Sequence, residues 1–154
     1  MHYRRRRHRR IPYRYFAKQV KLDAVLSKKV GAYVLATKTH DVSASLDRDL
    51  RLFVDMDMAV LGRPTRTGPG GYAEYAARIR SEYAHVSDAD YCTARAAFLA
   101  AASGGRSKPI YATSAYRASH EEAAHANMLW EADELLAGRI PGEEDEATGR
   151  RRKE

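Results

Sequence analysis

The chain has 154 residues, which is long enough for one domain with a core of its own. Its single cysteine, Cys92, excludes an intramolecular disulfide, and we interpret it as an inert thiol in a helical stretch. No apolar run approaches the length of about 18 residues that a membrane-spanning helix requires, and no signal-peptide core follows the basic N-terminus. We therefore expect a soluble, cytoplasmic protein that does not enter a membrane.

The net charge of +7 is concentrated at the N-terminus. Residues 1–14 contain seven arginines and no acid, which leaves 20 basic against 20 acidic residues in the rest of the chain. So charged a segment cannot bury an apolar face, and we predict a disordered arm over 1–14 and a charged disordered tail over 139–154. Three roles are open for the arm: binding of nucleic acid or another polyanion, targeting, and a solvated tail without function. The candidate nucleic-acid contacts are Arg4, Arg5, Arg6, Arg7, Arg9 and Arg10.

Between the two charged ends, over residues 15–138, apolar residues recur at helical spacing. The pattern predicts a first helix over residues 16–39 and a second over residues 46–61, where a glycine and a proline stop it. A third helix carries the apolar and aromatic positions from Tyr72 to Val86, after a loop rich in glycine and proline.

Two more helices are predicted from their end signals. Ser87 is typical of an N-cap, since two acids follow it in the first turn, and the fourth helix then ends at Gly104. Ser114 is a plausible cap for the last helix, which runs to about residue 137 before Gly138. Five helices without a strand pattern indicate a single all-α domain.

Two acids, Asp55 and Asp57, interrupt the apolar sequence of the second predicted helix. Asp57 falls four residues after Phe53 and four before Leu61, so we predict that it faces the core. Asp55 is rotated by about 200° around the helix and is predicted to face solvent or a neighbouring loop. A core-facing carboxylate needs a metal, a cation or hydrogen-bond donors. Asp57 is therefore either a metal ligand or an acid paired by an arginine or by helix-end amides.

Four motifs follow one another along the chain: ATKTH at 36–40, LFVDMDMAVLG at 52–62, YAEYAARIRSEYAHV at 72–86, and the stretch from KPIYAT to AHANMLWEADEL. In this order and approximate spacing they resemble the C-terminal half of the predicted metal-dependent HD-superfamily phosphohydrolases. The resemblance implies an all-α fold in which a His, a His-Asp dipeptide and a later Asp bind a divalent metal. That metal, Mn, Mg, Co or Zn, would activate water against a phosphate ester.

Residue by residue, the resemblance places the later family acid on the pair Asp55 and Asp57, of which the helical pattern favours Asp57. It places His40 at the histidine that closes the family's TK-x-H motif. His40 and Asp41 spell the His-Asp dipeptide, but they occupy this other motif, and the first His and the dipeptide have no matching residues here. One Asp and one His would hold a hard divalent ion only weakly. We therefore expect a truncated or inactive form of the phosphohydrolase.

The alternative is a non-catalytic helical module that binds a protein partner, or nucleic acid through the arm of residues 1–14. Helices missing from the family fold would leave apolar surface on the first two predicted helices. Three explanations are open for that surface: a second copy of the chain covers it, a separate partner protein covers it, or it makes the product of a truncated or decaying reading frame poorly stable.

Overall fold

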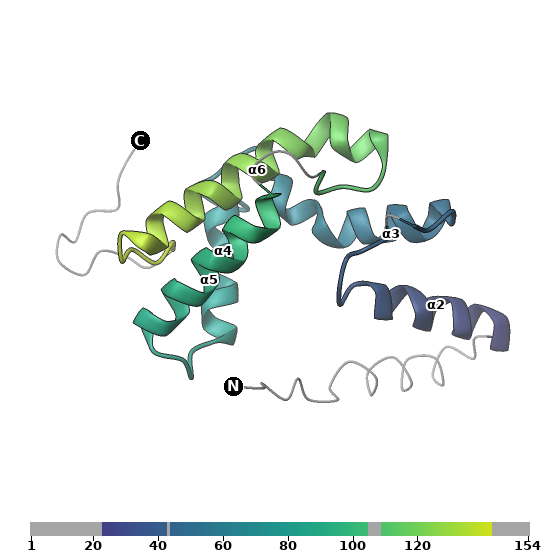
Figure 1. Cartoon of the computed structure of the whole chain (residues 1–154), viewed down its shortest axis with the longest axis horizontal. Coiled ribbons are helices and arrows are strands. Elements are labelled where there is room, and N and C mark those ends of the chain that lie inside the picture. The colour runs from purple at the N-terminus through teal and green to yellow at the C-terminus, as the bar shows by residue number, and fades with distance from the viewer. Residues whose placement is uncertain (1–22, 43, 105–108, 143–154) are drawn as a thin grey trace. The chain divides into compact units, whose positions relative to one another are not determined.

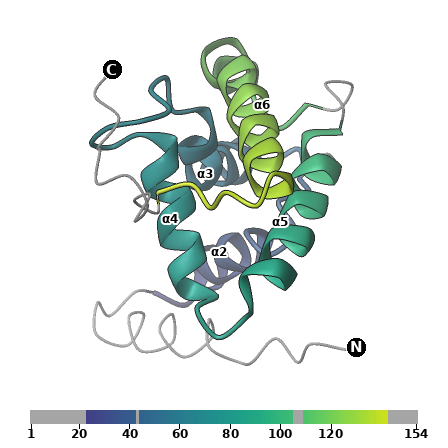
Figure 2. The same ribbon diagram turned by 90° about the vertical axis from the view of Figure 1, so that its left-hand side faces the viewer.

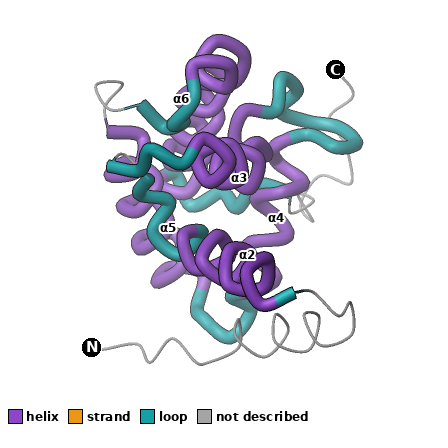
Figure 3. The backbone as a smooth tube through the Cα atoms, turned by 90° about the vertical axis from the view of Figure 1, so that its right-hand side faces the viewer, coloured by secondary structure: helices purple, strands orange, loops and turns teal. Residues whose placement is uncertain are grey.

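The computed structural model describes residues 23–42, 44–104 and 109–142, and within these ranges the chain is helical and has no strand (Figure 1 and Figure 3). The all-α prediction is thereby confirmed for the described part of the chain. The predicted arm of residues 1–14 lies outside it. The elements in chain order are α2 (Ala24–Ala36), α3 (Arg48–Met58), the 3₁₀ helix η1 (Ala59–Gly62), α4 (Tyr72–Glu82), α5 (Asp88–Ser103) and α6 (Ser114–Leu136).

The chain divides into two compact units, residues 1–54 and 55–154, and the division falls within α3. In the first unit, α2 begins after Asp23, whose carboxylate accepts a hydrogen bond from the N–H of Leu26 at 2.9 Å. Such a cap satisfies one of the N–H groups that a helix start leaves without a partner. The helix ends at Ala36, three residues before the predicted end.

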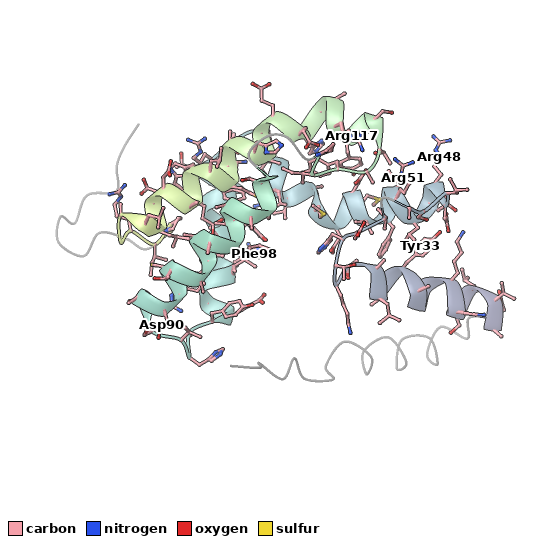
Figure 4. All side chains as sticks on the ribbon, viewed as in Figure 1. Tyr33, Arg48, Arg51, Asp90, Phe98 and Arg117 are labelled. Carbon is pink, nitrogen blue, oxygen red and sulfur yellow. The ribbon has the colours of Figure 1, made fainter. Side chains whose placement is uncertain are left out.

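Polar and aromatic contacts join α2 to the start of α3 within this unit. The hydroxyl of Tyr33 donates to Asp47 Oδ2 at 2.8 Å, and Lys29 Nζ lies 3.0 Å from Asp49 Oδ2 (Figure 4). The ring of Tyr33 also lies 5.5 Å from that of Phe53, centroid to centroid. Because the polar groups are exposed to solvent, these contacts position the helices more than they stabilise them.

Apolar side chains are exposed in this unit. None of the residues of α2 is buried, and Val25 is 80% exposed. Leu46, in the connection to α3, is fully exposed at 100%.

In the second unit, α6 packs along α5 and on η1, and α4 lies on its other side (Figure 2). A buried cluster from α5 and α6 forms the core. Partly buried apolar residues pack around it, among them Leu61 of η1 and Ile140 after α6. The core residues are Tyr91, Cys92, Ala96 and Leu99 of α5 and Met128, Ala132 and Leu135 of α6.

The ends of α5 and α6 follow local sequence signals. Ser87 caps α5 by accepting a hydrogen bond from the N–H of Asp90, and the helix ends at Gly104, which has a left-handed backbone with φ 54°. The N-cap of α6 is Thr113, one residue before the predicted Ser114. Beyond α6, Gly138 has φ 73°, as expected for a glycine stop.

The apolar pattern predicted that the third helix would extend to about residue 86. In the structure this helix, α4, ends at Glu82. The guanidinium of Arg80 donates to the carbonyls of Tyr83 at 2.7 Å and Val86 at 3.2 Å and pairs with the carboxylate of Asp88. These bonds hold the chain in a tight connection to α5 in place of a further helical turn.

The first four residues of the predicted tail, 139–142, belong to the described structure. Arg139 forms two hydrogen bonds of 2.8 Å with Glu134, and Ile140 packs against the core. The rest of the predicted tail lies outside the described residues. None of the helices described here has both the length and the apolar character needed to cross a bilayer.

Candidate functional site

The buried acid of α3 is Asp55, with no exposed surface, whereas Asp57 is exposed. The prediction that Asp57 faces the core and Asp55 faces solvent is therefore wrong. The prediction treated residues 46–61 as one regular helix and placed Asp57 on the same face as Phe53 and Leu61. The chain changes to 3₁₀ geometry at Ala59, so Leu61 does not keep the position that a regular α-helix would give it. Phe53 packs on Tyr33 within the first unit and is 36% exposed.

Both carboxylate oxygens of Asp55 accept hydrogen bonds from the residues that precede α6. Oδ1 accepts from the N–H of Ala112 at 2.7 Å, and Oδ2 accepts from the N–H of Thr113 at 2.8 Å and from its hydroxyl at 2.6 Å. Donors to an ionised carboxylate give short, strong bonds and compensate its loss of hydration. The positive end of the α6 dipole lies at the same place, since Thr113 is the N-cap. Pairing by helix-end amides, the alternative considered for Asp57, thus applies to Asp55.

Residues 110–113, which we call the pre-α6 segment, are also held from α6 itself. Glu121 accepts from the N–H of Ile110 at 2.5 Å and from that of Tyr111 at 3.2 Å. Arg117 Nε donates to the carbonyl of Tyr111 at 2.7 Å (Figure 4). The side chain of Tyr111 is buried, and its hydroxyl donates to the carbonyl of Met58 at 3.1 Å. Burial raises the pKa of Tyr111, so this hydroxyl stays protonated as a donor.

Next to this segment, His125 is buried on α6 and lies 3.3 Å from Glu121, from Nε2 to Oε1. Its Nδ1 has no hydrogen-bond partner in the structure. This pair was not among the predicted site residues, although its spacing of four residues places both side chains on one face of a helix.

A second buried network connects α4, α5 and α6 through Glu131, which is fully buried. Its Oε2 accepts from the hydroxyl of Tyr72 at 2.5 Å, and its Oε1 accepts from Arg95 Nε at 2.9 Å. Burial first, and then the nearby Glu131 carboxylate, raise the pKa of Tyr72. The hydrogen bond and charge of Glu131 raise the pKa of Arg95 in spite of its burial. Glu131 was not predicted as a site residue, although it lies on the apolar face of α6, three residues after Met128 and four before Leu135.

The remaining predicted ligand, His40, belongs to the first unit, while Asp55 and Asp57 belong to the second. His40 is exposed, and its backbone has φ 54°, in the left-handed region. Its N–H donates to the carbonyl of Ala36 at 3.0 Å, just beyond the end of α2. Among the described residues, no three or more His, Cys, Asp or Glu side chains are grouped so that they could bind a metal. The predicted nucleic-acid contacts between Arg4 and Arg10 lie outside the described residues.

Comparison of the chain with protein-family models, with curated proteins and with solved structures gives no match. The chemistry of these side chains and the motif resemblance in the sequence are therefore the evidence on function.

Proposed function

We propose that this chain is a helical module of the HD phosphohydrolase type that does not catalyse hydrolysis by itself. In this proposal Asp55, one of the two acids on which the resemblance places the later family ligand, anchors the start of α6. The observation that carries it is the set of three hydrogen bonds that Asp55 accepts from Ala112 and Thr113. Asp55 belongs to the motif LFVDMDMAVLG, and Ala112 and Thr113 belong to the stretch that begins with KPIYAT, so two of the four motifs that carry the resemblance meet in this contact.

A metal ion at Asp55 would compete with these donors. Turning a carboxylate oxygen toward a metal leaves buried N–H groups without an acceptor, at a cost of about 1–3 kcal/mol for each. A second carboxylate at the pre-α6 segment is that of Glu121, whose two oxygens already accept from the N–H groups of Ile110 and Tyr111. The carboxylates that surround this segment are thus engaged in holding backbone.

The described residues do not fit a hydrolytic metal centre. Such a centre needs about three or four protein ligands and an open position for water. Asp57 is the exposed acid of the pair, so an ion from solvent reaches it more readily than Asp55. Besides the acidic pair the resemblance assigns only His40, which is fewer ligands than such a centre needs, so the water on a bound ion would be neither strongly acidified nor aligned for attack. Any affinity for Mn, Mg, Co or Zn should accordingly be weak and depend on Asp57 more than on Asp55.

The test compares the wild type with Asp55→Asn and Asp57→Asn. Each protein is assayed with Mn, Mg, Co and Zn on an aryl phosphate and a panel of nucleotides, and metal binding is measured by titration calorimetry. We expect no metal-dependent turnover from any of the three and weak binding that only Asp57→Asn removes. Robust turnover by the wild type that is lost in a folded Asp57→Asn or Asp55→Asn variant would overturn the proposal.

A second function, binding of a polyanion such as nucleic acid, is favoured by the charge distribution. Residues 1–14 hold seven arginines, while the rest of the chain is balanced. Arginines that neutralise phosphates release the counterions condensed on the nucleic acid, so the affinity falls steeply as salt rises. The chain should therefore bind duplex DNA or RNA at low salt, and deletion of residues 1–14 should abolish binding. A second variant keeps the length of the chain and replaces the six arginines between Arg4 and Arg10 by glutamine, and it should abolish binding as well. Binding that survives either change, or that salt does not weaken, would exclude this role for the arm.

A second copy of the chain is the partner to test first, with a separate partner chain as the alternative. In the first unit, Val25 and Leu46 are each more than half exposed. Sedimentation velocity should then show a dimer or larger species whose population rises with protein concentration, and Val25→Ser should shift it toward the monomer. A monomer over the whole concentration range would point to a separate partner chain or to no partner.

A further inference from the structure

We draw no further inference here: the strongest candidate, the apolar surface patch of α5, where Ala94, Ala97, Phe98 (labelled in Figure 4) and Ala101 are exposed and no charged residue follows Arg95 within the helix, carries none because nothing in the structure shows what covers it.

Discussion

The carboxylate of Asp55 and residue Thr113, 58 positions apart in the chain, are joined by two hydrogen bonds to the same oxygen, Oδ2. One comes from the backbone N–H at 2.8 Å and the other from the hydroxyl at 2.6 Å. Thr113 Oγ1 at the same time accepts from the N–H of Tyr116 at 3.4 Å as the cap of α6. A single side chain thus satisfies the helix start and fixes it to α3.

Replacing Asp55 by asparagine should destabilise the protein by about 2–4 kcal/mol, because the amide has one acceptor oxygen and its NH₂ group faces a donor. Asp57→Asn also replaces a carboxylate by an amide, but at an exposed position of the same helix, so it should lower the free energy of unfolding by no more than about 0.5 kcal/mol. Urea unfolding followed by far-UV circular dichroism measures both. Equal effects of the two substitutions would show that the buried anchor contributes little to stability.

Removing the hydroxyl of Tyr72 should reveal the stabilisation that the Glu131 network provides. Tyr72→Phe deletes a buried hydrogen bond to an ionised acceptor and should cost about 2 kcal/mol. The pKa of Tyr72 is raised above its ordinary value of 10.0, so the bond is fully present below that pH and is lost only as pH rises further. The cost should consequently be the same at pH 6 and pH 8.

Tyr75→Phe is the matched control for this measurement. The ring of Tyr75 lies 5.6 Å from that of Tyr72, but the hydroxyl that donates to Glu131 is that of Tyr72. The control should therefore cost much less. A loss in Tyr72→Phe no larger than in the control would mean that Arg95 alone satisfies the Glu131 carboxylate.

His40→Gly should stabilise the protein by about 0.5–1 kcal/mol, since φ 54° is unfavourable for any residue with a Cβ and is readily adopted by glycine. His40→Ala removes the imidazole but keeps the Cβ, so it separates backbone strain from side-chain contacts. Thermal unfolding of the three proteins measures the difference. Destabilisation by glycine as well as by alanine would show that the imidazole makes contacts worth more than the strain.

The Tyr33 hydroxyl should control the titration of Asp47. The hydrogen bond from Tyr33, followed by that from the N–H of Leu50, lowers the pKa of Asp47 below its ordinary 3.8. A depressed pKa in the folded state contributes stability above the unfolded value and loses it as pH falls through the folded value. Tyr33→Phe should raise the pKa of Asp47 toward 3.8 and remove part of this acid dependence, as NMR titration of the carboxyl carbons measures.

Glu74 provides the internal control in the same spectra. Its pKa is lowered by the N–H of Gly70 and by Arg78, which lie in the second unit. Tyr33→Phe should leave this value unchanged. A shift of Glu74 that equals the shift of Asp47 would indicate a general change in the fold instead of the loss of one bond.

The features that sequence predicted well are those decided by neighbouring residues. Ser87, Gly104 and Gly138 mark helix ends through capping and left-handed backbone geometry, which depend on a few residues alone. The choice between Asp55 and Asp57 depends instead on the 3₁₀ turn at Ala59 and on the distant pre-α6 segment.

Glu131 and Thr113 were not predicted because their roles also depend on contacts with distant parts of the chain. Glu131 lies at a core position of α6, and the apolar spacing around it does not show what would pair with its charge. Its burial depends on Tyr72 and Arg95, which come from two other helices and compensate its charge. Thr113 rather than Ser114 caps α6 because its hydroxyl also reaches Asp55, a contact that only the folded chain supplies.

The bonds of the pre-α6 segment limit which residues the chain tolerates there. Ala112 offers Asp55 only its N–H, so small residues should replace it freely, whereas proline, which has no N–H, should not. Thr113 offers an N–H and a hydroxyl, so serine is the replacement that keeps every bond. A library randomised at these two positions and selected for folded protein should exclude proline at both and retain a hydroxyl at the second.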